Sequence, residues 1–299
     1  MSRIQIVEVA ARDGLQNEST YFDTESKISL VEQCFEAGID RLEVASFAHP
    51  KKVPQMADAE AVIGGLSPKT LSRSIGLVLN QRGVERAIDA KIPEINFVVV
   101  ATDTFARANQ GSTTADLVQT WLEVSRSAKS AGIRCSVAIA AAFGCPFEGE
   151  VNPKQVLELI SKILEGSPDE VGIADTIGSG VPADVQYLVS QSIRMLGDVP
   201  LRCHFHNTRN TGIANAYVAA NEGAAALDSS LGGIGGCPFA PRATGNIPTE
   251  DVVWMLQRSG FTVEAELPKL MESSKWLSQK LGKETPSLLS RAGVFPPES

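Results

Sequence analysis

The chain has 299 residues, of which 43% are hydrophobic and 21% charged, and its formal net charge is −8. This composition is typical of a globular protein with a sizeable core, and the length is one at which a single α/β barrel is common. The acidic balance argues against a nucleic-acid or anionic-membrane partner, because either would require a basic face. The sequence contains no apolar run of bilayer length.

The beginning of the chain and its cysteines predict a cytoplasmic protein. Met1 is followed almost at once by a strand-like segment, Ile4–Val9, so we expect no signal peptide. The cysteines are odd in number and lack a CxxC spacing, which favours reduced thiols. They are Cys34, Cys135, Cys145, Cys203 and Cys237.

Strand-like and helix-like segments alternate along the chain, which is the pattern of repeated βα units. Strands are predicted near Ile4–Val9, Arg41–Ala45, Arg73–Leu79, Glu94–Val100, Arg134–Ala140, Glu170–Ala174, Leu201–Phe205 and Ala225–Ser230. Amphipathic helices are predicted at Glu25–Ala37, Thr113–Ala131, Pro153–Leu164, Pro182–Leu196 and Gly212–Glu222. Eight such units close naturally into a (β/α)8 TIM barrel. An open doubly wound sheet is the alternative, but residues 10–14 lack the glycine-rich phosphate motif that it requires after the first strand.

A further amphipathic helix, Leu267–Leu281, and a proline-containing tail follow the eighth unit. Nothing in the sequence indicates a linker or a tandem repeat. We therefore predict one barrel domain over residues 1–299, with a C-terminal helical cap and tail from about residue 265. The cap is a candidate oligomer contact.

Polar residues stand at the ends of five predicted strands, where the active sites of barrels gather. The first strand leads into residues 12–18, the second contains Glu43, the sixth ends at Asp175 and Thr176, and the eighth leads into a glycine-rich loop at 232–238. The seventh contains His204 and His206. We expect all these groups to converge at one rim.

The spacing of His204 and His206 is informative because a strand directs residues i and i+2 to the same face. Both imidazoles then reach one metal ion, although a hydrogen-bonded pair at a strand end is the alternative. Asp13 and Asn246 would complete a mixed nitrogen and oxygen set that suits Mg²⁺ or Mn²⁺, with zinc as an alternative. Equally, Asp13 could pair with Arg12, and Asn246 could be a turn residue.

Cys237 lies in the glycine-rich loop, where a thiol above a metal site can exchange protons. A small apolar loop residue is the alternative. Residues 144–147, Gly-Cys-Pro-Phe, repeat residues 236–239, so the Gly-Cys-Pro motif by itself is not diagnostic.

Several motifs together resemble the 3-hydroxy-3-methylglutaryl-CoA (HMG-CoA) lyase family, within the superfamily of metallolyase TIM barrels. The similarity extends in order from about Ile4 to about Leu281. The motifs are Arg-Asp-Gly-Leu-Gln-Asn-Glu at 12–18, Ser-Phe at 46–47 with Pro-Lys at 50–51, Val-Pro-Gln-Met at 53–56, Gly-Cys-Pro at 144–146, Asp-Thr-Ile-Gly at 175–178, His-x-His at 204–206 and Gly-Gly-Ile-Gly-Gly-Cys-Pro at 232–238.

The resemblance implies a divalent-metal-dependent lyase that releases acetyl-CoA and a 3-oxo acid from such a thioester. It implies metal ligands at Asp13, His204, His206 and Asn246 and catalytic residues at Arg12, Asp13, Glu43 and Cys237. Substrate contacts are implied at Arg12, Gln16, Ser46, Asn80, Asp175 and Thr176. Arg12 would hold the thioester oxygen, and Asp175 would contact metal-bound water or substrate. The family also suggests a homodimer.

The departures from the family pattern concern substrate choice. Asn207 stands where the family usually has an aspartate, and Asn210 where a glycine is frequent. Ala138 and Ala140 replace a tyrosine and a serine, which enlarges the pocket and removes a hydrogen-bond donor. We therefore expect an acyl group that is bulkier or less polar at its branch than methylglutaryl.

Three alternatives remain at this point. An acetyl-CoA condensing synthase would usually carry a longer C-terminal region, and a metal-dependent aldolase would act on free hydroxy-oxo acids without CoA. A non-catalytic barrel would require the polar rim to be vestigial, but the set of Arg12, Asp13, His204 and His206 is intact.

Overall fold

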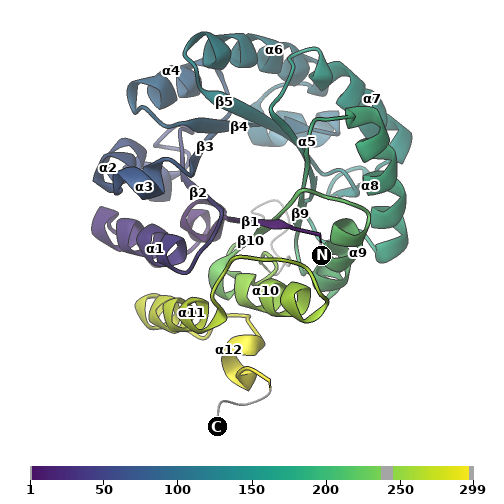
Figure 1. Ribbon diagram of the computed structural model, residues 1–299. Coiled ribbons are helices and arrows are strands. Elements are labelled where there is room, and N and C mark those ends of the chain that lie inside the picture. The colour runs from purple at the N-terminus through teal and green to yellow at the C-terminus, as the bar shows by residue number, and fades with distance from the viewer. Residues whose placement is uncertain (1, 237–244, 296–299) are drawn as a thin grey trace.

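The computed structural model describes residues 2–236 and 245–295. Eight parallel strands form a closed barrel in the order β1-β10-β9-β8-β5-β4-β3-β2, with helices around it (Figure 1). The strands are β1 (Gln5–Glu8), β2 (Arg41–Ser46), β3 (Ser74–Val78), β4 (Glu94–Val100), β5 (Arg134–Ala140), β8 (Glu170–Asp175), β9 (Leu201–Phe205) and β10 (Ala226–Ser229). The predicted TIM barrel is confirmed, and the open sheet is wrong because β1 pairs with β10.

The helical segments that the sequence predicted are present. They are α1 (Thr24–Glu36), α6 (Thr114–Ser130), α7 (Pro153–Leu164), α8 (Pro182–Leu196), α9 (Gly212–Asn221) and α11 (Leu267–Leu281). The helices that sequence analysis did not predict are α2 (Ala59–Gly65), α3 (Pro68–Leu71), α4 (Gln81–Asp89), α5 (Asp103–Gln110), α10 (Thr249–Arg258) and α12 (Leu289–Ala292). A hairpin of β6 (Gly144–Cys145) and β7 (Gly149–Glu150) was also missed.

Local sequence explains where the predicted helices begin and end. Thr113 and Asp116 form a reciprocal capping box at the start of α6. Pro153 and Pro182 occupy the first turns of α7 and α8, where a missing amide hydrogen costs nothing. After α1, Gly38 has a φ of +85°, a conformation that favours glycine.

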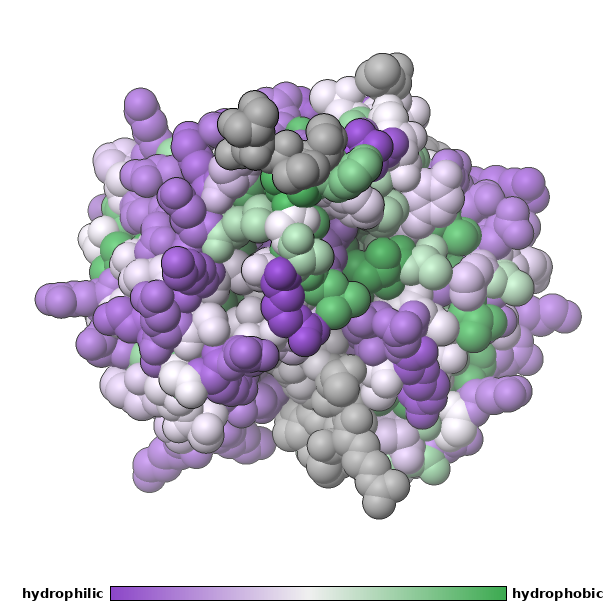
Figure 2. All heavy atoms as spheres, turned by 90° about the horizontal axis from the view of Figure 1, so that it is seen from below, coloured by the Kyte–Doolittle hydropathy of each residue, from purple (hydrophilic) through white to green (hydrophobic). Residues whose placement is uncertain are grey.

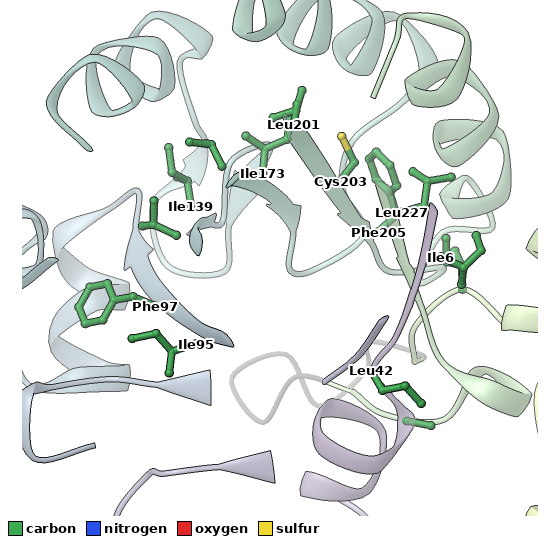
Figure 3. Packing of buried hydrophobic residues seen from close by; sticks show 14 of the residues in the cluster. Ile6, Leu42, Ile95, Phe97, Ile139, Ile173, Leu201, Cys203, Phe205 and Leu227 are labelled. Carbon is green, nitrogen blue, oxygen red and sulfur yellow. The ribbon is translucent and has the colours of Figure 1, made fainter. Parts of the chain in front are cut away.

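The main hydrophobic core lies between the strands and the helices. Figure 3 shows strand residues such as Ile95, Ile139 and Leu227 pointing away from the barrel axis into this layer. Cys203 and Phe205 flank His204 on this outer side, and both are fully buried. The alternation of β9 therefore places its histidines on the opposite face, toward the lumen.

The lumen is filled largely by charged side chains near the beginnings of the strands. Arg41 donates to Glu170 through Nη1 at 2.6 Å and also contacts Glu94. Arg202 lies 3.5 Å from Glu170. The buried ionic groups at this end are therefore paired with opposite charges, which is the condition for tolerating ions away from water.

The segment after β10 folds back against the barrel. α11 packs against α1, α10 and η3 (Leu231–Gly233), and α12 packs against α10 and α11 (Figure 1). On the face of the molecule seen from below, hydrophilic side chains surround a smaller group of apolar ones (Figure 2). Among the described residues, none of the helices is long and apolar enough to cross a membrane.

Glu8 links the two ends of the barrel chain. Its Oε1 accepts the amide hydrogens of Ala10 and Leu231, each at 2.8 Å, and its Oε2 accepts the hydroxyl of Thr249 at 2.6 Å. Burial outweighs these hydrogen bonds and raises the pKa of Glu8 from 4.5 to about 7. The loop after β1 and the loop after β10 are thus tied to one carboxyl group.

The raised pKa of Glu8 predicts a pH-dependent stability. Folding favours the protonated form, so this contribution is complete below pH 4.5 and is lost as the pH rises to about 7. At about 1.4 kcal/mol per pKa unit, the loss is about 3 kcal/mol. Urea denaturation between pH 4.5 and 8 should show this decrease, and Glu8→Gln should remove it. The exposed Glu123→Gln is the matched control, and an unchanged slope in Glu8→Gln would contradict the assignment.

Candidate metal-binding site at the carboxyl ends of the strands

Arg12 and Asp13 are placed by a five-residue π-turn, η1 (Ala10–Gly14), directly after β1. The amide hydrogens of Arg12 and Gly14 both bond to the carbonyl of Val9, at 3.1 Å. A turn of this kind is rare and occurs frequently at functional sites. The sequence does not reveal this π-turn, because a periodic pattern cannot be recognised over only five residues.

Asp13, His204 and His206 form one cluster whose potential ligand atoms lie within 4.8 Å of one another. Asp13 Oδ2 is 3.9 Å from Nε2 of His206, and the two imidazole centroids are 5.0 Å apart. The structure therefore brings together three of the four residues that the resemblance implied as ligands.

Asn246 lies beside the cluster, in the chain segment that follows the glycine-rich loop after β10. An isolated bridge pairs Asn246 with His206, and the amide hydrogen of Ile247 bonds to the carbonyl of Phe205 at 3.3 Å. The Asn246 amide group donates to Asp13 Oδ2 at 2.8 Å, while its buried Oδ1 has no hydrogen-bond partner among the described residues. This is more than turn chemistry.

These donor atoms fit a divalent cation. An unpartnered buried amide oxygen is costly unless something binds it, and here it accompanies a carboxylate and two imidazoles. A mixed oxygen and nitrogen set without thiolates is typical of Mg²⁺ or Mn²⁺ sites rather than structural zinc.

The electrostatics of the cluster also suit a cation. Burial acts to raise the pKa of Asp13, but Arg12, the two histidines and the Asn246 amide outweigh it and lower that pKa to about 2. Burial and the neighbouring His204 lower the pKa of His206 to about 4. At neutral pH, Asp13 is therefore an anion and His206 is a neutral imidazole.

His204 has a partner that sequence analysis missed. Its Nδ1 lies 3.1 Å from Oδ2 of Asp228, a buried residue of β10. Burial acts to lower the pKa of His204, but the carboxylate of Asp228 outweighs it and raises that pKa. Asp228 is the register partner of His204 on the neighbouring strand β9. The alternation of side chains along β10 could have shown that Asp228 faces the lumen.

Arg12 lies between two carboxylates. Its Nη1 is 2.5 Å from Asp13 Oδ1, and its Nε and Nη2 contact Glu43. The other oxygen of Glu43 accepts the amide of Asn96 at 3.0 Å. Asp13 therefore forms an ion pair with Arg12 and also belongs to the cluster with His204 and His206. Glu43 likewise belongs to a buried ion-pair network.

The glycine-rich segment closely approaches the cluster of Asp13, His204 and His206. Gly235 has a φ of +109°, and a Cβ there would lie 2.6 Å from the Asn246 amide nitrogen. A Cβ on Gly245 would lie 2.4 Å from the carbonyl oxygens of Gly233 and Gly235. Only glycine permits this contact between segments. Cys237, which was predicted to be catalytic, lies outside the described residues.

The other predicted substrate contacts follow the carboxyl ends of their strands, but most of them serve local structure. Asn80 caps α4, Ser46 accepts the amide hydrogen of Ala48, and Thr176 accepts that of Ala141. Gln16 lies half-buried beyond η1. Their contacts with a substrate stay a prediction.

Asp175 is fully buried and is engaged by its own loop. Its carboxylate accepts the amide hydrogens of Ser179 at 2.8 Å and of Gly180 at 2.9 Å. Burial nevertheless raises the pKa of Asp175. In this geometry Asp175 shapes the loop after β8.

Two departures from the family pattern have visible consequences. Asn210 has a φ of +58°, so a glycine is natural there and asparagine is among the residues that tolerate this conformation. Ala138 and Ala140 are only half-buried although they lie within β5. Gly172 on the adjacent strand β8 is the register partner of Ala138, and a Cβ on Gly172 would lie 3.0 Å from the Cβ of Ala138. Small residues thus leave accessible space inside the barrel.

Comparisons by sequence and by structure find related proteins over nearly the whole chain. The profile of the HMGL-like family matches residues 3–277. The chain is 39% identical to (R)-citramalyl-CoA lyase of Chloroflexus aurantiacus, over 99% of this chain and 97% of that protein. It is 35% identical to hydroxymethylglutaryl-CoA lyase YngG of Bacillus subtilis, over 95% of each. An HMG-CoA lyase from Acinetobacter baumannii, solved with coenzyme A and 3-methylmalate, superposes with a TM-score of 0.95 at 36% identity, over 99% of this chain and 97% of that one.

The close approach at Gly235 generates a prediction. In Gly235→Ala the new methyl group must displace the Asn246 amide, which lies 2.6 Å from its position. We expect Mn²⁺ affinity to fall by about tenfold or more, as measured by electron paramagnetic resonance of free Mn²⁺. Gly111→Ala is the matched control, since Gly111 also has a positive φ, +72°, but open space around it. Equal losses in both variants would attribute the effect to backbone strain.

Proposed function

The chain belongs to the HMGL-like family, and from that premise we propose that it is a divalent-metal-dependent lyase of 3-hydroxy-3-substituted acyl-CoA thioesters. Its curated relatives make it a carbon–carbon lyase of the oxo-acid class, acting on CoA thioesters. The proposal adds the metal, the roles of the residues and the nature of the acyl group.

One observation carries the proposal. The potential ligand atoms of Asp13, His204 and His206 lie within 4.8 Å of one another. Asn246, whose Oδ1 has no hydrogen-bond partner among the described residues, is bonded to Asp13 and belongs to the same group. These four residues come from three separate parts of the chain. The hydrogen bonds within this group leave Oδ1 of Asn246 and Nδ1 of His206 without partners among the described residues.

Cleavage requires that the 3-hydroxyl lose its proton, that C3 become a carbonyl, and that the electrons of the C2–C3 bond pass to the thioester. A bound Mg²⁺ or Mn²⁺ would lower the pKa of the substrate hydroxyl and align its oxygens. Asp13, His204, His206 and Asn246 would hold the ion. The leaving fragment is an enolate, which becomes acetyl-CoA after protonation at C2.

Arg12 is suited to the thioester oxygen. A guanidinium has five N–H donors, and the contacts with Asp13 and Glu43 leave some of them free. Glu43 and Asp13 fix the plane of the guanidinium, so that its remaining donors meet the developing enolate without reorganisation. Glu43 is therefore proposed to position Arg12.

Two further roles are proposed. Cys237 would deliver the proton to C2 of the enolate, a step for which general acid help is typically worth about 10²–10⁴ in rate. Asp175 would act on substrate through the loop that its carboxylate organises. Gln16, Ser46, Asn80 and Thr176 would line the substrate path at the same rim.

The space beside Ala138 supports an acyl group larger or less polar than methylglutaryl at its branch. Both Ala138 and Ala140 are half-buried, and Gly172 on the adjacent strand β8 is the register partner of Ala138. An alkyl group of a few carbons that enters this space would gain about 0.8 kcal/mol per buried methylene.

A second substrate type is favoured by the 39% identity with (R)-citramalyl-CoA lyase. Citramalyl-CoA has the same 3-hydroxy-3-methyl thioester but one methylene fewer before its distal carboxylate. The reaction at C2 and C3 is unchanged. The two substrate types differ only in where the distal carboxylate must be bound.

The proposal predicts acetyl-CoA release from a panel of 3-hydroxy-3-alkylglutaryl-CoA thioesters and citramalyl-CoA. With Mg²⁺ or Mn²⁺ present, His204→Ala should abolish release and Mn²⁺ binding. His49→Ala, which removes an exposed histidine outside the cluster, should keep Mn²⁺ binding. Absence of release from every thioester would favour an aldolase for free acids or a non-catalytic barrel, and turnover of free hydroxy-oxo acids would distinguish these two.

The pocket hypothesis has its own test. Ala138→Tyr should lower kcat/KM for the larger alkyl substituents by at least about tenfold relative to the methyl compound, because the ring refills the space. The methyl compound serves as the internal control in steady-state assays of both enzymes. Rapid turnover of the methyl compound by the unsubstituted enzyme, with no cleavage of any larger one, would refute the hypothesis.

A further inference from the structure

The two histidines of the cluster are held differently. His204 Nδ1 lies 3.1 Å from Asp228 Oδ2, and a carboxylate can only accept a hydrogen bond. The ring must therefore carry its proton on Nδ1. By contrast, Nδ1 of His206 is buried without a hydrogen-bond partner among the described residues.

Asp228 itself has little freedom to move. Its side chain is 8% exposed, and its second oxygen, Oδ1, lies 3.4 Å from Nε of Arg202. The same Arg202 nitrogen is 3.5 Å from Glu170 on β8. Asp228 Oδ1 makes no hydrogen bond among the described residues, so Arg202 acts on it as a neighbouring opposite charge.

We propose that Asp228 is a positioning residue that fixes the ring of His204 in the Nδ1–H tautomer and leaves Nε2 as its metal-ligating atom. The part that concerns the metal rests on the proposed function, whereas the tautomer is a property of the polypeptide alone. Carboxylates that orient ligating histidines in this way typically change metal affinity by about 10- to 100-fold.

The geometry also explains why a charged residue occupies this place in β10. A neutral imidazole rotates about its side-chain bonds and exchanges its two tautomers, so an unsupported ring would offer a protonated nitrogen part of the time. Asp228 removes both freedoms with one hydrogen bond. Arg202 provides the opposite charge that makes a buried carboxylate tolerable.

The first test uses the metal-free wild-type protein with ¹⁵N-labelled histidine, at a pH where the rings are neutral. The chain has only three histidines, so long-range ¹H–¹⁵N spectra are simple, and single histidine substitutions assign the signals. His204 should show the Nδ1–H pattern. His49 is an internal reference for the Nε2–H tautomer, because its Nδ1 accepts the amide hydrogen of Lys51 at 3.2 Å.

The second test compares Mn²⁺ dissociation constants by electron paramagnetic resonance. Asp228→Ala should bind Mn²⁺ about 10- to 100-fold more weakly and lose the single tautomer of His204. Asp228→Asn, whose amide oxygen still accepts a hydrogen bond, should lose less. Asp58→Asn is the matched control, since it removes a carboxylate paired with the buried Lys27 at 2.6 Å, far from the cluster.

The outcomes separate this inference from the proposed function. An Nε2–H pattern for His204 in the wild type, or wild-type Mn²⁺ affinity in Asp228→Ala, would overturn the inference. Absence of Mn²⁺ binding by the wild type would instead overturn the metal-dependent function, while the tautomer spectrum would still decide the role of Asp228. If Asp228→Ala does not fold, the wild-type spectrum and Asp228→Asn give the answer.

Discussion

Pairing of β1 with β10 is the contact on which the rest of the structure depends. It runs from Gln5 opposite Ala226 to Glu8 opposite Ser229, and it closes the barrel between the first and last strands. Closure brings Asp13, near the start of the chain, within hydrogen-bond distance of Asn246. It also allows Glu8 to bond to amides on both sides of the junction. The candidate site exists only when this junction forms.

The lumen contains many buried charged side chains, most of which are paired and some of which are not. Buried charges are costly unless they are paired, and here Arg41, Arg202 and Arg12 each face two or more carboxylates. At the upper rim, the pairing is incomplete, because the amide oxygen of Asn246 and one nitrogen of His206 lack partners among the described residues. Arg41 Nε, Arg202 Nη1 and Asp228 Oδ1 in the lumen also lack hydrogen-bond partners among the described residues. The unpartnered atoms at the rim indicate a ligand site because they adjoin the carboxylate and imidazoles of the cluster.

Much of the fold could be predicted because its strands and long helices carry strong periodic patterns. The predicted α7, α8 and α11 have the observed bounds, since proline or glycine defines their ends. The short α2 and α5 were missed because too few residues display a period there, whereas α10 was missed although it has as many residues as the predicted α9. Within α1, the apolar Ile28 and Phe35 are only half-buried, whereas the charged Lys27 is buried and paired with Asp58.

The sequence by itself determined the barrel, the rim that holds the polar residues and the pairing of His204 with His206 on one face, because these follow from strand alternation and chain order. Only the tertiary structure decided the partner of each group. Asp228 beside His204, Glu8 between two loops and Asn246 donating to Asp13 join residues 24, 223 and 233 positions apart. Such contacts depend on the stagger of neighbouring strands and on the close approach of glycine-rich segments, which no local pattern encodes.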